Sequence, residues 1–350
     1  MTNVLTQHNE TSRRAFLKRA ALAWGALATA NGAWSFDWKK TFAAEFSDGP
    51  EPTTEEIDAA ICVLSETAGP KWSDERLKAA LTIQRSVDRL EAKDFNDYFN
   101  GSAENAARWI AERGVLRFLD AGFDKILREV PTTEVAEGTV VFWQIYNMGY
   151  VVKTPTQTFA VDVRHRRAPE LEPLVDFTLI THNHGDHFTR SFIQAMEAAG
   201  KPVVSNFLDN RWKTGPDGGE YEFGDAKIRV NLVDHNAKLR RFVSTYEIDC
   251  GAATGNRVVY HVGDACNFAQ LTPEKPIDVF IPHLAVGLDV PKCVNETLKP
   301  KLTLLSHILE LAHDIDKWRW SYKYGLGICA KCASDAVLLP VWGEKIVVGG

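Results

Sequence analysis

The chain has 350 residues, of which 45% are hydrophobic, and this size allows one large domain together with a smaller one. Its formal net charge of −6 argues against nonspecific nucleic-acid binding, which requires a basic surface. Residues 1–30 contain four basic residues, Arg13, Arg14, Lys18 and Arg19, and one acidic residue, Glu10, so their net charge is +3. The remaining chain therefore has a net charge of −9.

The N-terminal 30 residues have the order of an export signal. Arg13 and Arg14 lie in the stretch Thr-Ser-Arg-Arg-Ala-Phe-Leu-Lys, and the apolar run Ala20–Ala30 follows and ends in Ala-Thr-Ala. The run has 11 residues, whereas a transmembrane helix needs about 20. The segment resembles a twin-arginine signal with its cleavage site. The resemblance implies that the twin-arginine export machinery delivers the folded protein to the periplasm; an amphipathic or disordered tail is the alternative.

Residues 31–131 are expected to form a small helical region without a chemical motif. Thr53-Thr54-Glu55-Glu56 is typical of a helix start, and Ser73–Ala92 has apolar residues at helical spacing. Asn105–Arg113 is expected to be a helix that Gly114 caps, and Pro131 closes the region. The region could be a lid on the catalytic domain or a surface for a partner.

Residues 138–350 are expected to form the second, catalytic domain, in which short strands alternate with turns and occasional helices. Strands are predicted over Thr139–Asn147, Thr158–Val163 and Ala226–Val233, the last after a hairpin turn at Phe223–Ala226. Thr189–Ala199 is predicted to be a helix closed by Gly200. Many short strands with few helices indicate an α/β fold of two packed sheets flanked by helices. No stretch after the signal is long and apolar enough to be an integral membrane segment.

The strongest chemical motif is Thr-His-Asn-His-Gly-Asp-His at Thr181–His187, directly after the apolar run Phe177–Ile180. It holds three of the ten histidines of the chain, and imidazole and carboxylate are both zinc ligands. His182 and His184 can converge on one metal from a turn at a strand end, while Asp186 and His187 can hold another.

The heptapeptide resembles the His-x-His-x-Asp-His signature of the metallo-β-lactamase superfamily. That family takes three more ligands from the ends of later strands, and His235, Asp264 and His307 each follow an apolar run in the same order. Asp162 takes the family's acidic position after an early strand, and the tail from Pro340 to Ile346 resembles the ascorbate-6-phosphate lactonase subgroup. The resemblance covers about residues 138–350 and implies an αββα sandwich with its site at the edge between the sheets.

The resemblance also implies the metal ligands and the chemistry. His182, His184 and His235 would hold one zinc, and Asp186, His187 and His307 the other. Asp264 would bridge the two ions, so Asp186 and Asp264 are the candidate catalytic carboxylates. Manganese or iron could replace zinc. A metal-bound water has a pKa near 7, so hydroxide is available to attack a carbonyl or phosphoryl centre of a small-molecule substrate.

Other polar residues are interpreted as structural. His261 is expected to pack or hydrogen-bond, and His313 to form a surface pair with Asp314. His283 could reach the site as an acid–base group or as a partner of the ligands, but it is expected not to. The basic runs at 164–167 and 238–241 are interpreted as exposed loops, with contact to the substrate as the alternative for both. Cys329 and Cys332 form a C-x-x-C pair, which is either a local disulfide, permissible after export, or two thiols.

Three functions are open. The first is a metal-dependent hydrolase of a lactone, ester or amide. The second is a phosphodiesterase or phospholipase-D-like hydrolase on the same dinuclear site. The third is a metal-binding protein without turnover, whose helical region serves a partner.

Overall fold

The computed structural model describes residues 50–67, 72–313, 319–333 and 336–349. The predicted signal at 1–30 lies outside these residues, as do residues 31–49 of the predicted helical region. The described residues from Pro50 onward belong to one compact unit. None of the described helices is long and apolar enough to cross a membrane.

Helices fill the described chain before the first strand, as the apolar spacing predicts. They are α3 (Thr54–Glu66), α4 (Asp74–Val87), α5 (Ala92–Asn100), α6 (Ala103–Glu112) and α7 (Gly114–Thr132). The predicted start is confirmed, because the Thr53 hydroxyl accepts from the Glu56 backbone N–H while the Glu56 carboxylate accepts from Thr53.

The predicted cap at Gly114 is wrong. Arg113 ends α6 in an extended conformation, and Gly114 begins α7 instead of terminating the helix before it. A side chain at Gly114 would come within 2.6 Å of Ile57 Cδ1, so α7 packs closely against α3 at this position. Pro131 lies in the last turn of α7, near the predicted end.

The first sheet has six strands in the order β13-β1-β2-β3-β4-β5. They are β1 (Thr139–Gln144), β2 (Tyr150–Lys153), β3 (Thr158–Val161), β4 (Phe177–Leu179), β5 (Val203–Val204) and the C-terminal β13 (Lys345–Gly349). Strands β3, β4 and β5 run parallel, and β13 pairs antiparallel with β1. Helix α8 (Arg190–Ala198) follows β4, and Gly200 has a φ of 71° just after its end, as predicted for a closing glycine.

The second sheet has seven strands in the order β12-β11-β10-β9-β8-β7-β6. They are β6 (Gly219–Phe223), β7 (Ala226–Val233), β8 (Val243–Asp249), β9 (Val258–His261), β10 (Val279–Ile281), β11 (Leu302–Leu304) and β12 (Val337–Leu338). The predicted hairpin is confirmed, with Phe223 paired to Ala226 and Gly224 at a φ of 57°. Helices α9 (Val290–Lys292) and α10 (Tyr322–Cys329) lie between later strands.

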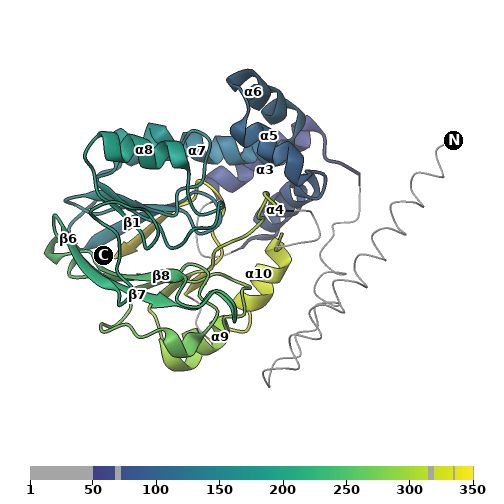
Figure 1. Ribbon diagram of the computed structural model, residues 1–350. Helices are drawn as coiled ribbons and strands as arrows, with labels where there is room; N and C mark the ends of the chain where they lie inside the picture. The colour runs from purple at the N-terminus through teal and green to yellow at the C-terminus, as the bar shows by residue number, and fades with distance from the viewer. Residues whose placement is uncertain (1–49, 68–71, 314–318, 334–335, 350) are drawn as a thin grey trace. The chain divides into compact units, whose positions relative to one another are not determined.

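The main core lies between the two sheets. Phe142 and Phe159 of the first sheet and Tyr246 and Val259 of the second belong to one buried hydrophobic cluster. In Figure 1, α7 and α8 lie on one side of the paired sheets, and α9 lies on the other. Two sheets packed face to face between helices form the αββα arrangement expected from the sequence.

The helical region packs on the sandwich through buried polar and aromatic contacts. Arg76 of α4 forms a buried ion pair with Glu344, just before β13. Phe118 of α7 stacks on Trp342 with ring centroids 5.3 Å apart, and Trp143 Nε1 donates to Glu129 at 2.9 Å. The helices before the first strand therefore share their packing with the sheets.

The run at 164–167 is not the exposed loop that the sequence indicates. His165 is buried and stacks on Phe123 of α7, with ring centroids 3.8 Å apart. Arg167 forms ion pairs with Asp124 and Glu170. The second basic run, at 238–241, contains the exposed Lys238, Arg240 and Arg241, as predicted.

Candidate metal centre

Parallel strands place the site at one edge of the sheets. Strand β10 lies between β9 and β11 and runs parallel to both. Because parallel strands end at the same edge of a sheet, the residues that follow them, Asp264, His283 and His307, come together there. The heptapeptide Thr181–His187 follows β4 and reaches the same place from the first sheet.

The first predicted ligand group is assembled as expected from the sequence. His182, His184, His235 and Asp264 offer ligand atoms that all lie within 4.8 Å of one another. His182 Nε2 lies 3.1 Å from His184 Nδ1, and His235 Nε2 lies 3.5 Å from Asp264 Oδ2. The ring of Phe242 packs beside His182, His184 and His235 and forms an apolar wall.

The second predicted group is equally close. Its ligand atoms all lie within 4.8 Å of one another and come from Asp186, His187 and His307. His307 Nε2 lies 3.1 Å from Asp186 Oδ2, and His187 Nε2 lies 3.6 Å from the same oxygen. His307 has a φ of 72°, which is unusual for a residue other than glycine and is typical of strained functional positions.

Asp264 lies between the two groups. Its Oδ1 is 3.3 Å from His187 Nε2 of the second group, and its Oδ2 is 3.5 Å from His235 of the first. Each oxygen therefore faces one group, which is the arrangement that a bridging carboxylate requires.

Polar neighbours fix the orientation of the ligands. Asp162 Oδ2 lies 2.9 Å from His187 Nδ1, while Asp162 also accepts from the Thr181 backbone N–H and hydroxyl. Asn147 Nδ2 donates to Asp186 Oδ2 at 3.2 Å. A carboxylate on one ring nitrogen leaves the other nitrogen for a metal, so Asp162 prepares His187 Nε2 as a ligand.

The charges of the centre are strongly coupled. Burial alone would raise the pKa of Asp264, but His187 and His283 bring it well below its usual value. Burial would lower the pKa of His187, yet the carboxylates of Asp264, Asp186 and Asp162 raise it well above its usual value. Burial lowers the pKa of His182 and of His184, which favours the neutral rings that a metal binds.

The residues fit a pair of divalent cations. His187 Nε2 and Asp264 Oδ1 are buried and lie 3.3 Å apart, but neither forms a hydrogen bond, although buried polar atoms without one are rare in folded proteins. Both atoms face the centre, where a cation would satisfy them. The nitrogen and oxygen donors suit zinc, and they also accept manganese or iron.

His283 is the residue at the centre that the sequence interpretation left out. It is buried, its ring lies 4.0 Å from that of His307, and its ligand atom groups with Asp264 and His307 within 4.8 Å. The Ala285 N–H donates to its Nδ1 at 2.8 Å, so in the neutral ring Nε2 carries the proton. His283 therefore supplies an N–H donor. The sequence feature that could have identified His283 is its position directly after an apolar strand, because the predicted ligands also follow apolar strands.

The other discounted histidines are structural. His261 is buried and donates from Nε2 to the Met148 carbonyl at 2.8 Å, as expected. His313 Nδ1 lies 2.7 Å from the buried Glu310 carboxylate. Cys329 and Cys332 form no disulfide in the described part of the chain.

The αββα architecture and the placement of the heptapeptide at the edge between the sheets decide the fold. The chain has the metallo-β-lactamase fold. No family model matches the sequence.

Two curated relatives share part of the sequence. A UPF0173 metal-dependent hydrolase from Staphylococcus carnosus is 25% identical over 158 residues, which cover 38% of this chain and 67% of the relative. A protein of the same name from Carboxydothermus hydrogenoformans is 27% identical over 154 residues, covering 39% of this chain and 68% of the relative. The predicted class, a metal-dependent hydrolase, agrees with both names.

Solved structures resemble the chain more distantly. A metallo hydrolase from Ignicoccus hospitalis aligns with a TM-score of 0.45 and 14% identity over 61% of this chain and 99% of its own. The metallo-β-lactamase fold protein YhfI of Bacillus subtilis aligns with a TM-score of 0.42 and 13% identity, over 61% and 99%.

Proposed function

We propose that the chain is a dinuclear metal-dependent hydrolase of a small-molecule lactone, ester or amide. The observation that carries this proposal is the position of Asp264, whose two oxygens face two separate ligand groups. A carboxylate placed in this way could be shared by two cations, and a pair of cations would supply hydrolytic chemistry.

Each ligand group would hold one ion, with zinc the proposed metal. When bound, the ions supply an acidified water and a Lewis acid for a carbonyl or phosphoryl oxygen. Asp162 fixes the His187 ring, and Asn147 fixes the Asp186 carboxylate. The Nε2–H of His283 gives the centre a donor that can stabilise negative charge as it develops on the substrate. Phe242 places an apolar ring against one side of the first group.

A panel of substrates tests the proposal against its alternatives. The metal-loaded protein is assayed on lactones, esters, amides and phosphodiesters that carry the same reporter group. Turnover of phosphodiesters alone would favour the phosphodiesterase or phospholipase-D-like alternative. Retention of metal without turnover of any substrate would favour a metal-binding protein that serves a partner.

Metal content is the first quantitative prediction. Protein purified without chelator is expected to hold about two ions per chain, because the ligands form two groups that share one carboxylate. Elemental analysis by mass spectrometry measures the ratio. A folded protein with a ratio near zero would contradict the assignment, and a ratio near one would remove the bridging role of Asp264.

Export to the periplasm is proposed on the N-terminal sequence alone, because that segment lies outside the described residues. Replacing both Arg13 and Arg14 by lysine is expected to leave the precursor in the cytoplasm, because the receptor recognises the twin arginines and not the charge. Cell fractionation measures where the protein accumulates. The molecular mass shows whether the signal has been cleaved. Undiminished periplasmic yield of the double variant would show that another route carries the protein.

A further inference from the structure

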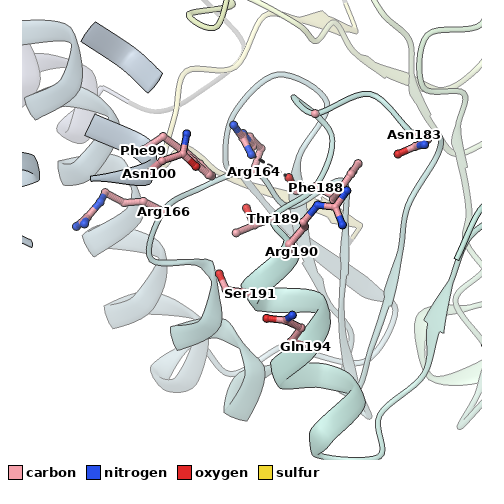
Figure 2. Close-up of a pocket in the computed structure, with 11 residues that line it drawn as sticks. Phe99, Asn100, Arg164, Arg166, Asn183, Phe188, Thr189, Arg190, Ser191 and Gln194 are labelled. Carbon is pink, nitrogen blue, oxygen red and sulfur yellow. Dashed lines mark hydrogen bonds between the residues drawn. The ribbon is translucent and has the colours of Figure 1, made fainter. Parts of the chain in front are cut away.

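A cavity of about 560 Å³ lies beside the metal-binding loop, outside the two ligand groups. Its walls include Phe99 of α5, Arg164 after β3, Asn183 of the heptapeptide, and Phe188, Arg190 and Ser191 at the start of α8. Arg164 and Arg190 line the cavity from different segments, and Figure 2 shows Arg166 extending away from both. Arg166 instead donates to the Tyr98 carbonyl of α5.

The cavity has an unbalanced positive charge. No aspartate or glutamate lines it, and within the described chain neither Arg164 nor Arg190 forms an ion pair. Arg167, close by in sequence, pairs with Asp124 and Glu170. The residues that line this cavity therefore include cations and no anion, in a chain with a net charge of −6.

Arg164 is the less solvated of the two cations. Its guanidinium lies 3.4 Å from the centroid of the Phe99 ring, and one end donates to the Phe188 carbonyl at 3.2 Å. Its Nε is buried without a hydrogen-bond partner. Burial lowers the pKa of Arg164, and the nearby Asp186 and Glu310 oppose this effect without forming an ion pair with it. An anion in the cavity would supply both the missing charge and a hydrogen-bond acceptor.

The start of α8 adds to this preference for anions. The Thr189 hydroxyl oxygen accepts from the His165 N–H, its proton is shared between the carbonyls of Val163 and His165, and it does not cap the helix. The backbone N–H groups of Arg190 and Ser191 are in the first turn, where no intrahelical acceptor exists. Together with the two guanidinium groups, they form a site suited to oxygen anions.

The cavity adjoins the proposed catalytic centre. Asn183 and Gly185 line it, and they alternate along the chain with the predicted ligands His182, His184 and Asp186. The negative charge of Asp186 also acts on Arg164. A group bound between Arg164 and Arg190 would therefore be held next to the loop that carries the metal ligands.

We propose that this cavity binds an anionic group of the substrate, a carboxylate or a phosphate, while the neighbouring bond is hydrolysed. The inference rests on the proposed function and narrows it to acidic substrates. Arg164 and Arg190 are specificity-determining residues here, because they contact the substrate away from the reacting bond.

Matched esters test the inference. Three substrates share one alcohol reporter, and their acyl groups end in a methyl, a carboxylate or a phosphate. The wild type is expected to have the lowest KM for one of the two anionic esters, which identifies the anion. In Arg190→Gln and Arg164→Gln, KM for that ester should rise by about tenfold or more, the cost of a charge-assisted hydrogen bond, while KM for the neutral ester stays unchanged.

Arg240→Gln is the matched control, since it removes the same charge from an exposed loop that does not line the cavity. Circular dichroism checks that each variant folds. Because Arg190 is exposed, Arg190→Gln is expected to fold and still tests the inference if Arg164→Gln does not fold. Equal effects on neutral and anionic esters, or an effect of Arg240→Gln as large as that of Arg190→Gln, would overturn the inference.

A binding measurement separates this inference from the proposed function. Inorganic phosphate and acetate are titrated calorimetrically into the purified metal-loaded wild type and Arg190→Gln. At least one anion should bind the wild type about tenfold more tightly than the variant, even if no ester is hydrolysed. Anion binding that the substitution leaves unchanged would place the anion elsewhere, at the metal centre for example, and would overturn the inference while the hydrolase proposal stands.

Discussion

Asp264→Asn is expected to lose both turnover and metal. The substitution keeps the size of the side chain but removes the charge that offsets two divalent cations, and an amide cannot present an anionic oxygen to each ligand group. His187 and His235, on either side of Asp264, would lose the carboxylate that they share. Activity should fall at least about tenfold further than in His261→Asn, since even the loss of an outer partner costs about tenfold to a hundredfold.

Two comparisons make this result specific. Asp217→Asn applies the same chemical change to a fully exposed side chain and should keep both metal content and turnover. His283→Asn should keep its metals but lose turnover, because its Nδ1 is already used by Ala285 and its Nε2 is a donor. Elemental analysis and steady-state rates measure all four variants, and circular dichroism confirms their folding. If Asp264→Asn kept two ions while His283→Asn lost them, the ligand set would have to be rebuilt around His283.

Removing the metals is expected to abolish turnover and to make the folded state sensitive to alkaline pH. In the metal-free protein, Asp264, Asp186 and Asp162 hold the pKa of His187 well above 6.5, its ordinary value. A raised pKa in the folded state gives stability that is fully present below the unfolded value and is lost as the pH rises through the folded value. The metal-free protein should therefore become less stable above about pH 6.5.

The other shifted groups of the centre titrate outside this range. Burial lowers the pKa of His182, His184 and His283, and His187 lowers that of Asp264, so these groups change charge below pH 6.5. Metal binding has the opposite dependence, because ligands must lose their protons and affinity rises with pH.

The difference in Tm between loaded and chelator-treated protein should accordingly widen from pH 6.5 to pH 9. Calorimetry of the two forms across this range measures it, and re-addition of zinc should restore turnover. A difference that stays constant or narrows would show that His187 does not carry the proton in the metal-free centre.

Local sequence determined the parts of this protein that depend on neighbours in the chain. The start of α3 is set by Thr53 and Glu56, which hydrogen-bond to each other three residues apart. The hairpin between β6 and β7 follows from Gly224, which supplies a positive φ without steric cost. Four of the predicted ligands lie in one heptapeptide, so a single turn brings them together whatever surrounds it.

Tertiary structure decided what depends on distant contacts. Gly114 has the pattern of a helix cap, but packing against Ile57 makes it the first residue of α7. His165 lies in a basic run typical of a surface loop, but Phe123 of α7 covers it. Neither contact has a local signal, because both partners come from helices far away in the sequence.

The same limit applies to the site. His235, Asp264 and His307 could be chosen from the sequence because each follows an apolar strand in the order of a known pattern. His283 has the same local context, yet only the insertion of β10 between β9 and β11 brings it to the edge where those ligands meet. The sequence alone thus predicted a set of candidate metal ligands. The order of strands in the sheet decided which of them meet, because hydrogen bonding between strands depends on the whole fold and not on residues adjacent in the chain.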